Sequence, residues 1–133
     1  MDTTELHTVK QASEMLEVPK YTIRKFCNQG LVPHVKRARN RYRVFTPEQI
    51  NWLKTLIHLR ESGMSTAELK KYAALCRSGK SSILERKAIL ETKKRQLWQE
   101  LEDIQSNIDF IERKIEIFDK NLSEGTELPS EYF

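Results

Sequence analysis

The chain has 133 residues, of which 38% are hydrophobic and 32% charged, and its formal net charge is +4. This balance is typical of folded, helix-rich proteins and argues against a disordered chain. The sequence has no apolar run of about 18 residues and no apolar leader, so we expect neither a membrane span nor a signal peptide but a cytoplasmic protein.

The charge is distributed unevenly along the chain. Residues 1–76 carry 13 Lys/Arg against 7 Asp/Glu, a net charge of +6, whereas residues 77–133 carry 10 against 12. A basic region attracts a polyanion, because each phosphate that it neutralises releases condensed counterions. The basic residues 1–76 therefore predict a nucleic-acid partner. Residues 77–133 carry no such excess of positive charge, so their role needs another explanation.

Two short helices are expected in the first 30 residues. Thr8 and Gln11 have the spacing of a capping box and begin a helix over residues 9–16. Pro19 has the fixed φ that suits the first turn of a second helix, which ends before Gly30. Two short helices joined by a tight turn form a helix-turn-helix.

Residues 34–45 predict a small two-stranded hairpin, since β-branched and aromatic residues flank the turn at Ala38-Arg39-Asn40. Five of the eight residues from Lys36 to Arg43 are basic. A hairpin of this size is not stable alone, so we expect it to pack on the helices and leave its basic tip free.

Two further capping boxes begin a third and a fourth helix. Thr46 and Gln49 form the first of them, with a proline at the first helical position, and Ser65 and Glu68 form the second. The fourth helix is expected to end at about Cys76.

The last part of the chain predicts one long helix, because no glycine or proline occurs from about Ser82 to Lys120. A helix of roughly 58 Å, at 1.5 Å per residue, cannot bury an apolar seam on a small domain. It needs a partner helix, most simply from a second copy of the chain. The predicted dimerisation residues recur at alternating intervals of four and three, as in a heptad seam: Leu97, Leu101, Ile104, Ile108, Ile111, Ile115 and Phe118.

The expected fold is mainly α, and it has four parts. They are a winged helix-turn-helix DNA-binding domain at 1–76, a linker at 77–82, a coiled-coil dimerisation helix at 83–122 and a C-terminal tail at 123–133.

Recognition of duplex DNA places the second helix of such a domain in the major groove, while a basic wing contacts phosphates. The alternatives are an ordinary basic surface helix and a solubilising charge run, which the combination of both features disfavours. The predicted DNA-binding residues are Lys20, Tyr21, Thr22, Arg24 and Lys25 in the helix and Lys36, Arg37, Arg39, Arg41, Tyr42 and Arg43 in the hairpin.

Three segments together resemble the MerR family of transcription regulators over about residues 8–120. Residues 18–32 are similar to its recognition helix, which commonly contains T-L/I-R-Y-Y-E followed by G-L. Residues 40–45 match its wing pattern N-G-Y-R-x-Y, and residues 59–65 match L-R-x-x-G-x-S. The sequence departs from the pattern at Lys25, where an aromatic residue is common, and at Cys27, where an acid is common.

The resemblance implies that Arg24 and Tyr21 contact DNA from the helix, and that Tyr42 and Arg43 contact the backbone from the wing. It also implies an antiparallel coiled-coil dimer on an inverted-repeat promoter site. Members of the family distort an overlong promoter spacer so that RNA polymerase can use it, which is a form of indirect readout.

The resemblance is to the short branch of the family, without a separate effector domain. In its aldehyde- and thiol-responsive members the reactive cysteine lies where this sequence has His58, so we do not expect that activity here. Cys76 is a candidate thiol sensor because it lies beside Arg77 and Lys80. The alternative is a small buried side chain that closes the fourth helix.

No carboxylate pair, nucleophile–base set, metal cluster or phosphate-binding loop occurs at a usable spacing, so we expect no enzyme activity, metal or cofactor. The main hypothesis is a homodimeric regulator that binds promoter DNA and acts on RNA polymerase through promoter geometry, with no membrane partner. The alternatives are an architectural DNA-binding protein without effector response and a coiled-coil adaptor with a basic head.

Overall fold

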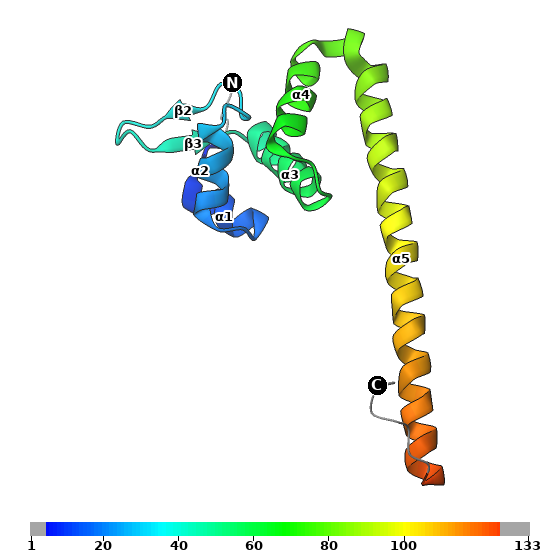
Figure 1. The fold of residues 1–133 in the computed structure, drawn as a ribbon. Helices are drawn as coiled ribbons and strands as arrows, with labels where there is room; N and C mark the ends of the chain where they lie inside the picture. Colours follow the sequence, from blue (N-terminus) through cyan, green and yellow to red (C-terminus); the bar gives the residue numbers. More distant parts are fainter. Residues whose placement is uncertain (1–4, 126–133) are drawn as a thin grey trace. The chain divides into compact units, whose positions relative to one another are not determined.

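The computed structural model describes residues 5–125 (Figure 1). Residues up to Ile89 belong to one compact unit, here called the head, and those from Leu90 onward to a second. None of the described helices has a stretch that is long and apolar enough to cross a membrane. The elements are β1 (His7–Thr8), α1 (Val9–Leu16), α2 (Lys20–Asn28), β2 (Lys36–Arg37), β3 (Arg43–Phe45), α3 (Pro47–Glu61), α4 (Thr66–Arg77), the short 3-10 helix η1 (Gly79–Ser82) and α5 (Ile83–Glu124).

All three predicted capping boxes are present. The Thr8 hydroxyl accepts a hydrogen bond from the Gln11 backbone N–H at 3.1 Å, and the Gln11 side-chain oxygen accepts one from the Thr8 N–H at 2.9 Å. Each box satisfies two N–H groups that have no partner within the helix, and so determines where the helix begins. The other two boxes join Thr46 with Gln49 and Ser65 with Glu68.

The turn of the helix-turn-helix contains Glu17 in the left-handed conformation, with φ 56° and ψ 43°. Its N–H donates to the carbonyl oxygen of Ser13, and the N–H of Val18 donates to the same oxygen at 3.2 Å. This conformation closes α1 in the way that glycine usually does. A side chain with a Cβ costs roughly 1–2 kcal/mol there.

We therefore expect Glu17→Gly to raise the free energy of unfolding by about 0.5–1 kcal/mol. Glycine removes the Cβ strain, and its larger conformational entropy in the unfolded chain offsets part of that gain. Urea unfolding followed by circular dichroism measures the change. Glu17→Ala is the matched control because alanine keeps the Cβ, and equal stabilisation by both variants would show that backbone strain is not the cause.

The wing, which is the hairpin over residues 34–45, is part of a three-stranded sheet in the order β1-β3-β2, whereas the sequence predicted two strands. In the antiparallel pair β2–β3, Lys36 lies opposite Val44 and Arg37 lies opposite Arg43. The additional strand β1 pairs with the other edge of β3. It has only two residues, which is too short for an alternating pattern to reveal it.

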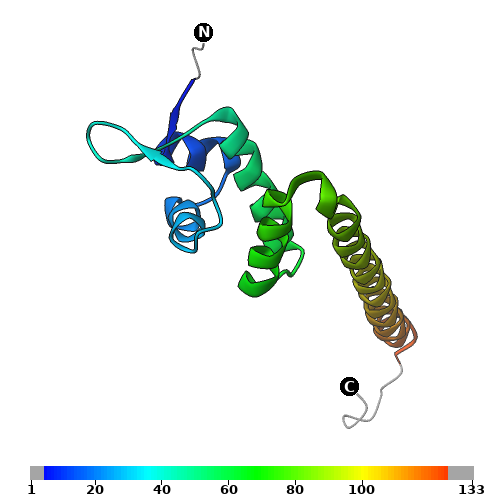
Figure 2. The same cartoon turned by 90° about the horizontal axis from the view of Figure 1, so that it is seen from above.

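Hydrogen bonds within its loop order the tip of the wing, which projects from the helices of the head (Figure 2). The Arg41 N–H donates to the Ala38 carbonyl at 2.8 Å, and the Tyr42 N–H donates to the Asn40 side chain at 3.1 Å. Arg41 itself is left-handed, with φ 68°, at the place where the family wing pattern has glycine. The Arg37 guanidinium donates to the Arg41 carbonyl at 2.8 Å and supports this loop.

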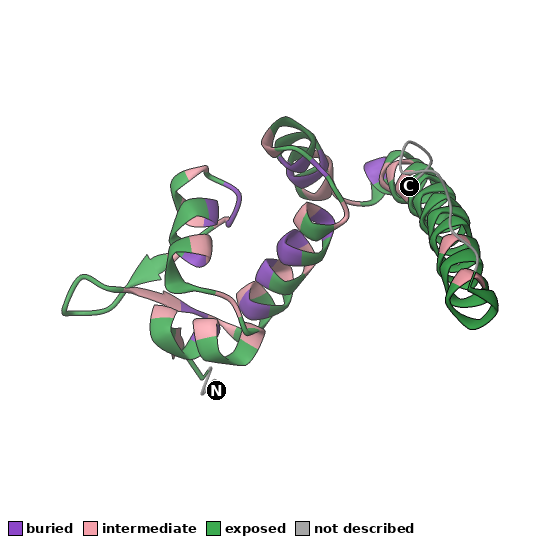
Figure 3. Ribbon diagram, turned by 60° about the horizontal axis from the view of Figure 1, so that its bottom comes forward, coloured by how far each residue is buried: buried purple, intermediate pink, exposed green. Residues whose placement is uncertain are grey.

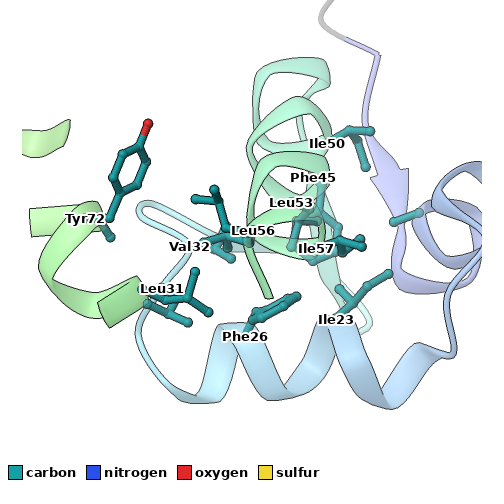
Figure 4. Packing of buried hydrophobic residues seen from close by; sticks show 14 of the residues in the cluster. Ile23, Phe26, Leu31, Val32, Phe45, Ile50, Leu53, Leu56, Ile57 and Tyr72 are labelled. Carbon is teal, nitrogen blue, oxygen red and sulfur yellow. The ribbon is translucent and has the colours of Figure 1, made fainter. Parts of the chain in front are cut away.

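One hydrophobic core holds the head together, and its buried side chains come from α1, α2, β3, α3 and α4 (Figures 3 and 4). Ile23 and Phe26 of α2 lie against the buried face of α3 (Figure 4). Farther along, the Trp52 ring of α3 stacks on Tyr72 of α4, with centroids 6.3 Å apart and planes 7° from parallel. Burial of each large apolar side chain contributes about 1.5–3 kcal/mol, so the core sets the position of both α2 and the wing.

The segment predicted as a linker, 77–82, is ordered and includes η1. Ser82 is buried, and the Arg86 guanidinium donates to its hydroxyl at 3.0 Å and to the Gly79 carbonyl at 2.9 Å. A third N–H of Arg86 points to the Cys76 sulfur at 3.9 Å. Arg86 therefore ties the end of α4 and η1 to the first turn of α5, all within the head.

Helix α5 continues without interruption over 42 residues to Glu124. Every predicted seam residue lies on it, and their side chains are 38–57% exposed. None of the residues of α5 is buried, and a dimerisation role of the seam residues stays a prediction. Of the predicted tail, residues 126–133 lie outside the described part of the chain.

Candidate nucleic-acid interface

Helix α2 is amphipathic, with its apolar side chains on one face and its polar side chains on the other. Ile23 and Phe26 are buried, whereas Lys20, Tyr21 and Arg24 are exposed on the opposite face. Residues three and four positions apart share a face of a helix, so Arg24 lies beside both Tyr21 and Lys20 on one surface near the start of α2. Lys25 is also exposed, and Thr22 is half-buried.

The wing presents different side chains on its two faces. Arg37 and Arg43 are paired across β2 and β3, and the next pair is Lys36 and Val44. Because successive residues of a strand point to opposite faces, the two arginines share one face and Lys36 lies on the other. The Arg43 guanidinium donates to the Asn28 side chain at 2.7 Å, which ties this face of the wing to the end of α2.

A groove of about 500 Å³ lies where the starts of α1 and α2 meet the arginine face of the wing. The residues that line it include no acidic side chain. Thr8, Val9 and Lys10 at the start of α1 also line the groove, so the positive end of this helix adds to its charge. The result is a concave, strongly cationic surface with the chemistry of a phosphate-binding site. Its five basic residues are Lys10, Lys20, Arg24, Arg37 and Arg43.

Lys10 is a member of this surface that the sequence analysis missed. It lies in the first turn of α1, 26 residues before the wing, and looks like an ordinary solvated lysine in the sequence. The pairing of β1 with β3 brings the start of α1 beside the wing. Nothing in the sequence indicates this two-residue pairing, so Lys10 could not be assigned to the surface from the sequence alone.

The structure brings together only some of the predicted DNA-binding residues. Five of the eleven line the groove: Lys20, Arg24, Arg37, Tyr42 and Arg43. Arg39 and Arg41 lie at the exposed tip of the wing, and Lys36 lies apart from the group on the opposite face. A role at DNA stays a prediction for all eleven residues.

The two cysteines lie in different surroundings. Cys27 is half-buried in α2, and burial raises the pKa of its thiol while the nearby Arg43 and Arg37 guanidinium groups lower it to a smaller extent. Cys76 is half-buried at the end of α4, beside Arg86. Burial raises the pKa of the neighbouring Tyr72 hydroxyl, and Cys76 raises it further. A thiol-sensing role for Cys76 stays a prediction.

No group of three or more His, Cys, Asp or Glu side chains in the described part of the chain is arranged to hold a metal ion.

The chain is similar to known transcription regulators. The model of the MerR HTH family of regulatory proteins matches residues 7–75. An uncharacterized HTH-type transcriptional regulator of Haemophilus influenzae is 28% identical over 120 residues, which is 90% of this chain and 89% of the relative.

Two solved structures are similar over most of their length. One is HiNmlR, a MerR family regulator lacking the sensor domain, bound to promoter DNA. It superposes with a TM-score of 0.85 at 27% identity, over 94% of this chain and 98% of that one. A MerR family transcriptional regulator from Listeria monocytogenes has a TM-score of 0.78 at 28% identity and covers 90% of both chains.

Proposed function

The chain belongs to the MerR HTH family of regulatory proteins, and we propose that it binds an inverted-repeat promoter site as a homodimer and distorts the promoter to control transcription. Its relatives and structural neighbours are DNA-binding transcription regulators and not enzymes. The observation that carries the proposal is the cationic groove between α1, α2 and the wing.

In this proposal α2 and the wing have different roles at the DNA. The exposed start of α2 enters the major groove, where Arg24 reads a base edge and Lys20 and Tyr21 lie beside it. Arg37, Arg43 and Lys10 hold the phosphate backbone and set the register of the helix. The hydrogen bond between Arg43 and Asn28 fixes the distance between the phosphate-binding wing and the reading helix.

Dimerisation through α5 accounts for the apolar seam. The seven seam residues are each at least 38% exposed in the single chain. Such a row of exposed apolar side chains on one helix face is typical of a protein–protein interface. A second copy with two-fold symmetry places two heads on one duplex, so the operator has the same symmetry as the protein. An antiparallel arrangement follows from the family resemblance.

Genomic footprinting followed by run-off transcription with RNA polymerase tests the proposal. We expect a two-fold symmetric footprint whose half-sites are separated by about one helical turn of DNA or a multiple of it, within a promoter. Transcription from that promoter should change when the protein is added. Binding without sequence preference would contradict the proposal, and specific binding that leaves transcription unchanged would favour the architectural alternative.

A further inference from the structure

A second cavity, of about 570 Å³, lies beside the wing in the head. Its size falls within the range of sites for small organic molecules. Apolar side chains form much of its wall: Leu6, Pro33, Val44 and Trp52. Polar residues complete it: His34, Lys36, Thr46, Glu48 and Gln49.

Polar groups of three residues around this cavity already have hydrogen-bond partners. The Trp52 indole N–H donates to the Leu31 carbonyl at 2.7 Å, and the Gln49 amide donates to the Pro33 carbonyl at 3.0 Å. Thr46 and Gln49 cap α3. These hydrogen bonds hold this part of the wall in place.

The charged groups of the cavity differ from these. Glu48 lies in the first turn of α3, where the positive end of the helix stabilises its carboxylate. The side chains of Lys36, His34 and Glu48 have no hydrogen-bond or ion-pair partner among the residues that the structure describes. The cavity therefore combines an apolar wall, the Trp52 ring, and an ammonium and a carboxylate that are not paired with each other.

We propose that this cavity binds a small aromatic anion, such as an aromatic carboxylate or sulfonate. The aromatic body packs against Trp52, Pro33 and Val44, and the anionic group pairs with the Lys36 ammonium and accepts a hydrogen bond from His34. This assigns Lys36 to a ligand and not to DNA, which accounts for its separation from the arginine face of the wing.

Ligand binding affects the DNA interface through the wing itself, a consequence that rests on the proposed function. Lys36 lines the cavity and its neighbour Arg37 lines the cationic groove, so the same two strands form a wall of both. A bound anion adds negative charge behind the phosphate-binding face. Bound ligand should weaken DNA binding by about two- to fivefold, and DNA should weaken ligand binding by the same factor.

The test uses two dyes of the same shape, the anionic 8-anilinonaphthalene-1-sulfonate and its uncharged analogue N-phenyl-1-naphthylamine. In a Trp98→Phe background Trp52 is the remaining tryptophan, and the full chain is titrated without DNA. We expect saturable quenching of Trp52 and changes in the NMR signals of the Trp52 indole N–H and the Val44 and Thr46 amides.

Substitutions at Lys36 supply the decisive comparison. Lys36→Glu should raise the Kd for the anionic dye at least tenfold and leave the Kd for the uncharged dye nearly unchanged, whereas Lys36→Arg should retain anion binding. The proposal is overturned if Trp52 shows no saturable response, if the NMR changes fall on α5 instead, or if Lys36→Glu binds the anionic dye as well as the parent protein. Because these titrations contain no DNA, their result is independent of whether the protein regulates transcription.

Discussion

Ile108→Asp converts the expected dimer into monomers at micromolar concentration. In the dimer this substitution removes two buried isoleucines and places two carboxylates in an apolar interface, so it costs about 3 kcal/mol or more per copy. A total of about 6 kcal/mol weakens dimerisation by roughly 10⁴-fold. Sedimentation equilibrium measures the change in mass, and circular dichroism checks that the helix is retained.

The same helix offers a matched control in Ile117→Asp. Ile117 is 45% exposed, similar to Ile108 at 43%. At 100° per residue it lies about 130° away from the centre of the seam. We expect Ile117→Asp to leave the dimer intact. Dissociation by both variants would mean that loss of helix stability is responsible, and a persistent Ile108→Asp dimer would mean that the seam is assigned to the wrong residues.

Arg24→Ala is expected to weaken specific DNA binding much more than non-specific binding. A bidentate contact between an arginine and a base contributes about 1–3 kcal/mol of discrimination, and the dimer contains two of them. Specific affinity should therefore fall by about 30-fold or more, whereas non-specific affinity loses only the contribution of one charge per head. Competition titrations with operator and scrambled duplexes separate the two effects.

Arg43→Ala provides the comparison for Arg24, because Arg43 lies in the same groove but on the wing. It should reduce affinity for all sequences about equally and lower the slope of log K against log salt by about one per head. Equal losses of specific and non-specific affinity in Arg24→Ala would assign that residue to the backbone, and a loss of specificity in Arg43→Ala would assign base recognition to the wing.

The helices could be predicted closely from the sequence because local chemistry determines their ends. Thr8, Thr46 and Ser65 each form the predicted capping box, and α1 begins at Val9 and ends at Leu16 as expected. The left-handed Gly30, with φ 72°, follows α2 closely. These signals lie within a few residues of the feature that they control, so they act before any tertiary contact forms.

Features that depend on distant contacts could not be predicted in this way. The strand β1, the place of Lys10 and the contacts of Arg86 all arise from packing between segments far apart in the sequence or from an ordered turn. The face of the wing on which Lys36 lies could not be predicted from the sequence for a different reason. Five of the eight residues from Lys36 to Arg43 are basic, so no alternation of apolar and polar residues shows which side chains share a face.

Strand register gives the wing an unusual sensitivity to insertions and deletions. Loss of one residue just before β2 would move Arg37 into the position of Lys36 and exchange the side chains of the two faces, although the composition of the hairpin would hardly change. Point substitutions behave differently, since those at Lys36 and those at Arg37 or Arg43 alter opposite sides. During divergence of relatives, each side of this small sheet can therefore acquire new chemistry while the other is preserved.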